Sequence, residues 1–501
     1  MAFFRRVTDY VRKHGAGYTL RRAAEMLSER VLHTYDRRAR RADPTAEELA
    51  RQRTEQPGAG LISVAVPVWN TRPDFLRELA ESLAAQTYGN WEAVLWDGGS
   101  TDADAVAAMD ALDDQRIRVI HSAENAGIAG NTNGAIRACR GDYVALCDHD
   151  DILTPDALWH MAAAISAEKP DMLYSDEDKL TEDDRIRTDP HRKPDFCPDN
   201  LRSGNYICHL MVIRRELLEE LGGLRPDFDG SQDHDLALRI AERTNRICHI
   251  PRVLYHWRTV GASMSHRRLA VCQDAAARAV TEHMQRIGYG GACTVEEGSL
   301  RLRYDVPDGL TVGTIRVPVG EGFAFINREA GRARADVLLI LSEGVTGLTE
   351  ADVRELLMYA QRDDVAAVTP QLVNRRGRVT HAGFTLQRGR IVSRNAGLPG
   401  SVGGWHGMNR TSHNVLAVST ACMMVRRDYF IPFDESLSGA EGAVDWCLRQ
   451  RERGLRCVYT PHARGVCEDM RLLRGETDAV CLRTTPPLRG DPLACGSKEQ
   501  A

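Results

Sequence analysis

The first half of the chain alternates short apolar runs with amphipathic segments. The apolar runs are rich in β-branched and aromatic residues and lie at 61–70, 91–97, 116–122 and 143–147. Runs of this length and composition are typical of buried strands. Apolar residues recur at helical spacing at 73–86 and 130–139. Because strands that alternate with helices form a parallel, doubly wound sheet, the pattern predicts an α/β fold.

The fourth apolar run ends in a cluster of acids. Asp148, Asp150 and Asp151 follow Cys147, and Thr154–Asp156 has the residue types that start a helix. The acids are therefore expected on a strand-to-helix loop. Side chains alternate along an extended segment, so Asp148 and Asp150 can share one cation. Carboxylate oxygens suit Mg²⁺ or Mn²⁺, and these ions in turn suit a diphosphate.

A solvated surface loop is the alternative for so short an acidic run. The position of the run favours a binding site, because ligands of parallel α/β sheets gather beyond the carboxyl ends of the strands. Asn70 follows the first predicted strand, and Asp97 closes the second. Together with Asp148 they can face one crevice of the size that holds a nucleotide. For Asp97 the alternative is a turn residue that bonds its own backbone beside Gly98.

Composition narrows the class of protein. The chain has 501 residues, enough for two or three domains, with 43% hydrophobic and 27% charged residues, as in soluble globular proteins. A net charge of -5 argues against a nucleic-acid binder. No apolar run approaches the roughly 20 residues of a membrane span, and the 13 cysteines form no Cys-x-x-Cys pair. We therefore expect a cytoplasmic protein without a zinc site.

Residues 1–56 differ from the rest of the chain. Between Arg5 and Arg41 there are 11 Lys or Arg against four Asp or Glu, and apolar residues recur at roughly helical spacing. This predicts one or two basic amphipathic helices, followed by a linker that ends near Gly60. The helices either pack on the main domain or make a peripheral contact with the anionic inner face of the plasma membrane.

Motifs between residues 61 and 265 resemble the family 2 glycosyltransferases, which have the GT-A fold. The motifs are, in chain order, Val66–Asn70, Ser82–Tyr88, Asp97–Asp102, Asn125–Ile128, Asp148–Asp151, Tyr174–Lys179, Gln232–Leu236 and Tyr255–Arg258. The subgroup most similar to this chain builds O-antigens, rhamnans and other surface polysaccharides. The resemblance implies inverting transfer of a sugar from a UDP- or dTDP-linked donor to a glycan or lipid-linked acceptor.

The resemblance also implies roles for individual residues around the donor. Pro67, Asn70, Asp97 and Asn125 would line the nucleotide pocket, with Asp148 on the diphosphate side. The family often has a second acid directly after Asp97, and this chain has a glycine there. The usual hydrogen bonds to uracil or thymine are therefore not all expected.

Metal and base candidates follow from the same resemblance. Asp148 and Asp150 would bind Mg²⁺ or Mn²⁺, and His256 matches a later His that can complete the coordination; a structural role is its alternative. Asp233 is the candidate base that deprotonates the acceptor hydroxyl. It could instead only stabilise the dipole of the helix it starts. Asp235 is expected to be a capping or packing acid.

The second half of the chain resembles a degenerate repeat of the first half. Residues 311–470 resemble a truncated second GT-A-like α/β domain, reached through a helical connector at 266–310. Residues 342–344 replace the acid pair of the first half, and Ala443 stands where Asp233 would align. We expect this domain to lack catalysis and residues 471–501 to form a disordered tail.

Three other functions are weighed against the transferase. A sugar nucleotidyltransferase would carry a Gly-rich, Arg-containing loop after its first strand, which residues 68–73 do not form. A phosphatase with an Asp-x-Asp nucleophile usually has its motif at the end of the chain's first strand. A catalytically inactive scaffold in a polysaccharide assembly complex is the third alternative. The intact acids of the first half argue against it.

Overall fold

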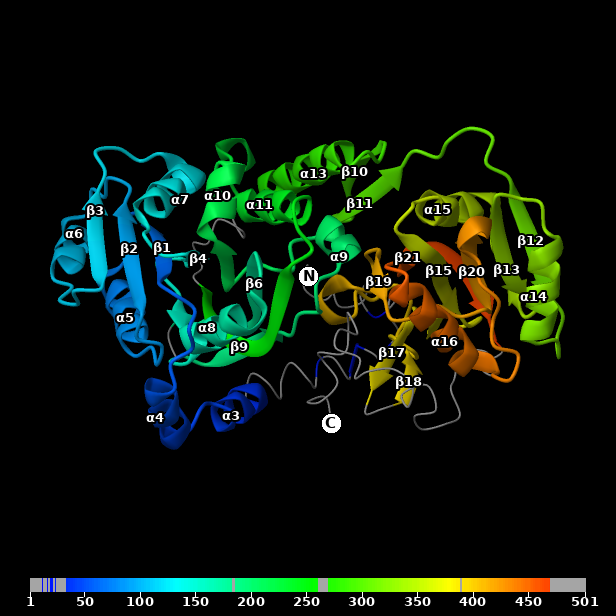
Figure 1. The fold of residues 1–501 in the computed structure, drawn as a ribbon, viewed down its shortest axis with the longest axis horizontal. Helices are drawn as coiled ribbons and strands as arrows, with labels where there is room; N and C mark the ends of the chain where they lie inside the picture. Colours follow the sequence, from blue (N-terminus) through cyan, green and yellow to red (C-terminus); the bar gives the residue numbers. More distant parts are fainter. Residues whose placement is uncertain are drawn as a thin grey trace. The chain divides into compact units, whose positions relative to one another are not determined.

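A computed structural model describes residues 33–182, 185–259, 269–387 and 390–468, with a few isolated positions before residue 33. The chain divides into two compact units (Figure 1). The amino-terminal unit takes its described residues from 25–196 and 204–287, and the carboxy-terminal unit takes them from 1–24, from 197–203 and from 288 onward. The predicted tail, and most of the predicted basic helices before residue 33, lie outside the described residues.

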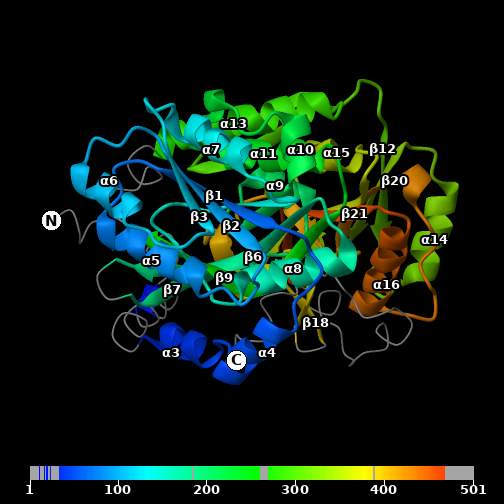
Figure 2. The same ribbon diagram turned by 60° about the vertical axis from the view of Figure 1, so that its left-hand side comes forward.

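The amino-terminal unit is built on a nine-stranded sheet with the order β3-β2-β1-β4-β8-β6-β9-β5, and β7 pairs with β6. Its strands β1, β2 and β3 lie side by side in Figure 2. Its strands are β1 (Ile62–Val68), β2 (Trp91–Asp97), β3 (Ile117–His121), β4 (Tyr143–Leu146), β5 (Ile152–Leu153), β6 (Met172–Thr181), β7 (Arg187–His191), β8 (Met211–Arg214) and β9 (Ile247–Thr259). The first four are parallel and coincide with the four predicted strands. The α/β fold is thus confirmed.

Helices cover this sheet and connect its strands. They are α5 (Pro73–Ala84), α6 (Ala103–Asp110), α7 (Gly127–Ala138), α8 (Ala157–Glu168), α10 (Arg215–Leu221), α11 (Gln232–Ala241) and α13 (Leu269–Arg286). Helix α7 packs on β1 and β2, and α13 packs on α11. Between sheet and helices lies one apolar core, in which Val64, Leu79 and Leu158 are fully buried.

The loop after β4 differs from the prediction. The chain first forms β5, which pairs with β9 in antiparallel fashion, and α8 begins only at Ala157. Thr154 does not cap the helix; its hydroxyl donates to Asp156, which holds the N-cap position. Leu153 is buried opposite Tyr255. Burial of this apolar side chain against β9 explains why a short strand precedes the helix.

The described end of the basic segment packs on the amino-terminal unit. It forms α3 (Thr34–Arg41) and α4 (Ala46–Thr54). The hydroxyl of Tyr35 donates to the buried carboxylate of Asp178 on β6, 2.8 Å away. The backbone N–H of Arg187 donates to Asp36 on α3. For these residues the packing matches the first of the two predicted alternatives.

The carboxy-terminal unit has an eight-stranded sheet with the order β12-β13-β20-β15-β21-β14, joined by β16 on β15 and β19 on β21. Its main strands are β12 (Val312–Val317), β13 (Val337–Ser342), β14 (Val345–Thr346), β15 (Val365–Val373), β20 (Cys422–Arg426) and β21 (Arg456–Cys467). Short strands β16 (Val379–His381) and β19 (His413–Val415) complete it. Three helices pack around this sheet: α14 (Phe323–Arg332), α15 (Glu350–Ala360) and α16 (Gly439–Glu452). Two hairpins belong to the same unit. They are β10 (Gly291–Glu296) with β11 (Ser299–Tyr304), and β17 (Phe384–Gln387) with β18 (Arg390–Ser393).

The two sheets share one topology. The run β12-β13-β20-β15-β21-β14 corresponds to β1-β4-β8-β6-β9-β5, and each neighbouring pair has the same direction in both sheets. Among residues 288–387 and 390–468, no strand takes the places of β2 and β3. The carboxy-terminal sheet is therefore a shortened repeat of the amino-terminal one.

One short helix from the first half of the chain belongs to the carboxy-terminal unit. Helix α9 (Pro198–Ser203) carries Asp199, whose carboxylate lies 2.5 Å from the guanidinium of Arg362. Asn414 donates to the same carboxylate. Both partners of the ion pair are almost fully buried, so the pair is shielded from water.

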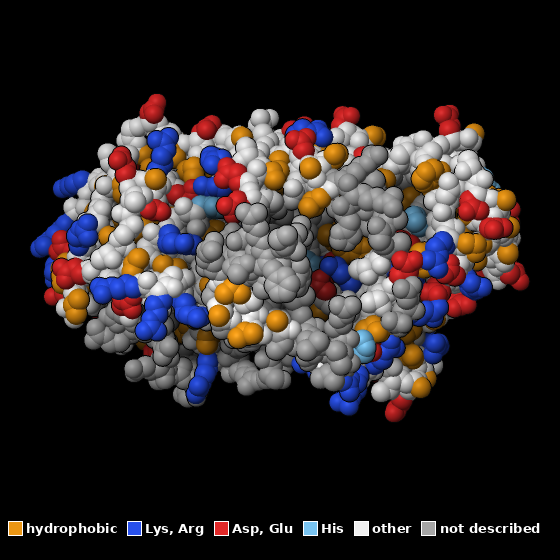
Figure 3. All heavy atoms as spheres, turned by 180° about the vertical axis from the view of Figure 1, so that it is seen from behind, with side chains coloured by type: hydrophobic (Ala, Val, Ile, Leu, Met, Phe, Trp, Pro, Cys, Tyr) orange, Lys and Arg blue, Asp and Glu red, His pale blue; other side chains and the backbone are white. Residues whose placement is uncertain are grey.

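On the surface, acidic and basic side chains are interspersed over the described part of the face in Figure 3.

Candidate active site

The carboxyl ends of β1 and β2 carry two of the predicted nucleotide-binding residues. Asn70 follows β1 and adopts a left-handed backbone conformation with φ 47°. Its side-chain oxygen accepts hydrogen bonds from the backbone N–H groups of Thr101 and Asp102. Asn70 thus ties the end of β1 to the turn after β2. Pro67 lies half-buried within β1, opposite Trp96.

Asp97 closes β2 and is buried, with both oxygens engaged. One oxygen accepts the backbone N–H of Ser100 at 2.9 Å, and the other lies 2.8 Å from Nδ1 of His121. Burial alone would raise the pKa of Asp97, but the hydrogen bonds from Ser100 and His121 outweigh burial and lower it. The hydrogen bond with Asp97 is also the main cause that raises the pKa of His121.

Gly98 takes the position of the family's second acid, and its surroundings explain the glycine. A Cβ at Gly98 would lie 2.3 Å from Nδ2 of Asn131, closer than any van der Waals contact allows. The Asn131 amide in turn donates to the side chain of Asn125, the fourth predicted nucleotide contact. The Asn125 side chain also accepts the backbone N–H of Gly127 and is exposed. The amide of Asn131, which is bonded to that of Asn125, therefore lies where the side chain of an acid at position 98 would start.

The three acids after β4 have different surroundings. Asp148 has a half-exposed side chain, and its backbone N–H donates to the hydroxyl of Tyr255. Asp151 is fully buried and accepts hydrogen bonds from the same hydroxyl and from the backbone N–H of Arg258. Asp150 lies between them with a side chain that is 27% exposed. The loop is thus hydrogen-bonded to β9 through the side chain of Tyr255 and the backbone of Arg258.

Burial and the neighbouring carboxylates both raise the pKa values of Asp150 and Asp151. Burial is the largest cause that raises the pKa of Asp150, and the nearby charge of Asp148 adds to it. The pKa of Asp151 is raised well above its usual range, first by burial and then by Asp150 and Asp148. Three acids this close favour a bound cation, because a positive charge would stabilise their ionised forms.

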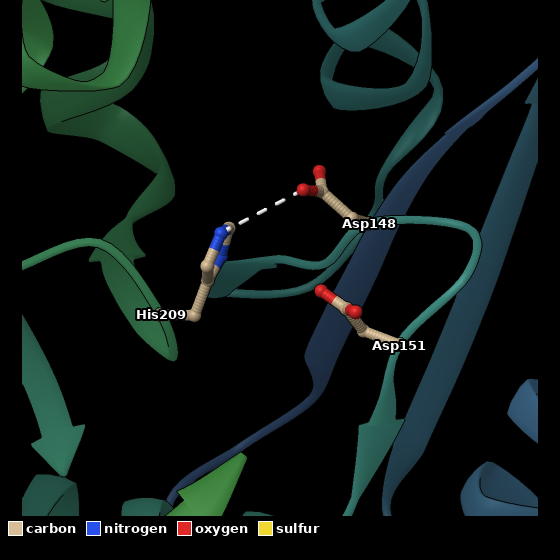
Figure 4. Close-up of side chains that lie close together, drawn as sticks. All are labelled: Asp148, Asp151 and His209. Carbon is tan, nitrogen blue, oxygen red and sulfur yellow. Dashed lines mark ion pairs between the residues drawn. The ribbon is translucent and has the colours of Figure 1, made fainter. Parts of the chain in front are cut away.

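Asp148 and Asp151 share their surroundings with a histidine that the sequence analysis did not select. One ligand atom each of Asp148, Asp151 and His209 lie within 4.8 Å of one another (Figure 4). Nε2 of His209 is 3.6 Å from Oδ2 of Asp148. In Figure 4 the imidazole and both carboxylates point into the same space. These are groups that can hold a divalent ion.

His256, the predicted metal ligand, has a different neighbour. Its Nδ1 lies 2.5 Å from Oδ1 of Asp178, which pairs with it across β6 and β9. The other oxygen of Asp178 accepts from Tyr35. The ring is buried and does not belong to the group around Asp148. The structure therefore brings Asp148 near His209, and places His256 in a separate hydrogen-bonded chain.

Asp233 lies on the first turn of α11, as the sequence analysis expected. The side-chain amide of Asn205 donates to its Oδ2 at 2.6 Å. The buried thiol of Cys208 has a raised pKa, first because of burial and then because of the carboxylates of Glu177, Asp233 and Asp148. The candidate base and the acid loop therefore both act electrostatically on this one thiol.

Asp235, two residues further along α11, has a packing role. It is fully buried and forms ion pairs with Arg225 and Arg239. Its position agrees with the expectation of a packing acid. Sequence reasoning did not select His209, and it gave no functional role to Asn205, although Asn205 and Tyr206 form one of the motifs shared with the family. His209 and Asn205 both lie in the segment before β8, whose antiparallel return beside β4 is set by tertiary structure.

Comparison with known proteins identifies the family of this region. Residues 63–222 match the family model described as "Glycosyl transferase family 2". An uncharacterized protein, y4gI of Sinorhizobium fredii, is 31% identical over 87% of this chain and 56% of its own length. The O-antigen biosynthesis protein RfbC of Myxococcus xanthus is 32% identical over 84% of this chain and 38% of its own length. This chain thus spans about half or less of these relatives.

Similarity to solved structures is more distant. Staphylococcus aureus TarS in complex with UDP-GlcNAc is 18% identical over 45% of this chain and 72% of that chain, with a TM-score of 0.36. A mannosyltransferase, PcManGT from Pyrobaculum calidifontis, in complex with GDP-Man and Mn²⁺, is 21% identical over 49% of this chain and 71% of that chain, with a TM-score of 0.35.

Proposed function

We propose that the protein, whose residues 63–222 match the model of glycosyl transferase family 2, transfers a sugar from a nucleoside-diphosphate sugar to a growing cell-surface glycan. The observation that carries this proposal is the acid loop of Asp148 and Asp150, which lies at the carboxyl end of β4, beside the strand ends that carry Asn70 and Asp97. The name of the Myxococcus relative, an O-antigen biosynthesis protein, supports a polysaccharide or lipid-linked acceptor.

In the proposed reaction the acceptor hydroxyl attacks the anomeric carbon of the donor. The bond between that carbon and the diphosphate oxygen breaks, and the diphosphate leaves with the electron pair. Asp233 takes the proton of the acceptor hydroxyl as general base. Attack from the face opposite the leaving group inverts the anomeric configuration. One base and no second nucleophile are needed for this course.

A divalent ion would neutralise the charge of the leaving diphosphate. The residues present fit such an ion, because the acids of the loop are crowded and supply the oxygen ligands that Mg²⁺ and Mn²⁺ prefer. Asp148 and Asp150 would hold it on the donor side. Asp97, Asn70, Pro67 and Asn125 would face the nucleoside. The donor would be UDP- or dTDP-linked.

The carboxy-terminal unit is proposed to be a repeat that has lost catalysis. Its matching strand order supports common ancestry with the amino-terminal sheet. After β13, the residue that follows Ser342 is Glu343, and no acid pair like that of Asp148 and Asp150 is present there. Residues 288–387 and 390–468 also lack the two strands whose ends carry Asp97 and its neighbours. We assign this unit a packing or acceptor-positioning role.

A peripheral contact of the basic amino-terminal segment with anionic membrane is proposed as well. None of the described helices has the length and apolar character needed to cross a membrane. Helix α3 carries Arg37, Arg38, Arg40 and Arg41. Sedimentation with anionic vesicles at low salt tests the contact. A protein that stays in the supernatant at low salt contradicts it.

The function is tested by thermal unfolding with UDP, dTDP or GDP, each with and without Mn²⁺. A ligand that binds only the folded state stabilises it by about 2.7 kcal/mol at a hundredfold excess over its dissociation constant. We expect one nucleotide to raise the unfolding temperature of the wild type only with metal, and Asp150→Ala to abolish the rise. If no nucleotide raises it, the inactive scaffold becomes the better description.

A further inference from the structure

We propose that His209 supplies a nitrogen ligand to the divalent ion, alongside Asp148 and Asp151, and that the site therefore selects Mn²⁺ over Mg²⁺. This inference rests on the proposed function. It adds His209, which the acid motif does not contain, and Asp151 to the ligands Asp148 and Asp150 of the proposed function. It also leaves His256 outside the coordination.

The pairing of two strands places His209 opposite the acid loop. Strands β4 and β8 are antiparallel, with Leu146 opposite Met211. Continued by two residues, the same register sets Asp148 opposite His209. The imidazole thus reaches the acids from the neighbouring strand, and it does so because β8 returns beside β4.

The distances fit a shared ion. Ligand atoms about 2.1 Å from an octahedral ion are about 3 Å apart when adjacent and about 4.2 Å apart when opposite. Nε2 of His209 and Oδ2 of Asp148 are 3.6 Å apart, between these limits. The whole group, with Asp151, lies within 4.8 Å.

The imidazole is held in place before any ion binds. Its ring stacks on Tyr255 with centroids 4.6 Å apart and planes 11° apart, and it meets Trp257 edge-on. Its backbone N–H donates to Glu177, and its carbonyl accepts from the buried Lys193. Tyr255 also bonds Asp151 and the backbone of Asp148. One tyrosine therefore positions all three proposed ligands.

Strand alternation places His256 apart from the proposed site. Tyr255 and Trp257 both contact His209, so they project from the same face of β9. His256 lies between them and projects from the opposite face. There its Nδ1 is bound to Asp178, whose second oxygen accepts from Tyr35.

The ligand set predicts the ion. Mg²⁺ prefers oxygen ligands and retains its water, whereas an imidazole ligand favours first-row transition ions. Carboxylates together with one imidazole suit Mn²⁺. We expect Mg²⁺ to compete poorly with Mn²⁺ at this site.

Electron paramagnetic resonance of Mn²⁺ tests the inference, with Mn²⁺ alone and with Mn²⁺ plus UDP. The wild type should show a modulation from a directly bound nitrogen. His209→Phe keeps the stacked ring but removes the nitrogens, so it should lose the modulation and weaken Mn²⁺ binding about 10-fold or more, the range known for altered metal shells. His256→Phe is the matched control and should keep both. Thermal unfolding verifies that each variant is folded.

The outcomes separate the two proposals. If His209→Phe binds Mn²⁺ as the wild type does and keeps the nitrogen modulation, His209 is not a ligand, while the metal-dependent transferase stands. A wild type that binds Mn²⁺ without any nitrogen modulation overturns the ligand role too, whether or not the variants fold. If the wild type binds no Mn²⁺ under either condition, the His209 proposal and the metal dependence of the proposed function both fail.

Discussion

The side-chain amide of Asn205 donates a hydrogen bond to the carboxylate of Asp233, with 2.6 Å between Nδ2 and Oδ2. The carbonyl oxygen of the same amide accepts the backbone N–H of Cys208, which sets the direction of the amide. Oδ2 of Asp233 is therefore engaged by Asn205. We infer that Asn205 orients the proposed base.

Replacement of Asn205 should impair the chemical step more than donor binding. Asp233→Asn removes the base and should lower kcat by about 10²- to 10⁴-fold, the usual contribution of general base catalysis. Asn205→Ala leaves the base but frees its orientation, so we expect a smaller loss, about 10-fold, again in kcat. Steady-state kinetics with a glycan acceptor measures both. The thermal shift caused by nucleotide and Mn²⁺ should stay at the wild-type value, and its loss in Asn205→Ala would assign the residue to donor binding instead.

The buried ion pair between Arg362 and Asp199 should stabilise the carboxy-terminal unit. Arg362→Ala leaves the Asp199 carboxylate buried with less compensation, and breaking a buried pair in this way costs about 3–5 kcal/mol. Urea unfolding of the full chain measures the change. Arg332→Ala is the matched control, because its pair with Glu329 is 69% exposed on the arginine side and should contribute at most about 1 kcal/mol. Equal effects of the two variants would contradict the prediction.

Gly98 should be intolerant of any side chain. Its Cβ would overlap the amide of Asn131, so Gly98→Ala should lower the free energy of unfolding by about 1–3 kcal/mol, as overpacking does. The double variant Gly98→Ala with Asn131→Ala should recover most of this loss. Gly331→Ala on α14 is the control, since its Cβ meets no atom within 4 Å and should stabilise the helix by about 0.5–1 kcal/mol. A double variant as unstable as the single one would locate the strain elsewhere.

The contact between His121 and Asp97 should stabilise the fold more in mild acid than in base. Folding raises the pKa of His121 above its ordinary value of about 6.5. Its contribution is therefore fully present below that pH and is lost as pH rises through the raised value. The lowered pKa of Asp97 keeps its carboxylate ionised throughout this range.

Urea unfolding of the wild type and His121→Gln, at pH 6 and again at pH 9, measures this effect. The wild type should exceed the variant in unfolding midpoint at pH 6, and the difference should shrink at pH 9. Asp110→Asn, which removes only the exposed second partner of the ring, should have a smaller effect. A difference of the same size at both pH values would exclude titration of His121 as its cause.

The pattern of apolar and polar residues is enough to predict the parallel half of the sheet and the residues at its edge. Continuous apolar runs and alternating helices suffice to predict β1, β2 and β4, because a parallel strand buried on both faces must be apolar along its length. Asn70, Asp97 and Asp148 follow from that prediction, since each stands where a run ends. The first-turn position of Asp233 is equally local.

Which side chains meet across long stretches of sequence depends on how the strands pair in the folded protein. His209 reaches Asp148 because β8 pairs with β4 in one antiparallel register, and His256 turns to Asp178 because β9 pairs with β6. Asp199 pairs with Arg362, far away in sequence, and both residues belong to the carboxy-terminal unit. Strand pairing and burial over many residues of separation depend on how the whole core packs, and no short segment of sequence encodes that outcome.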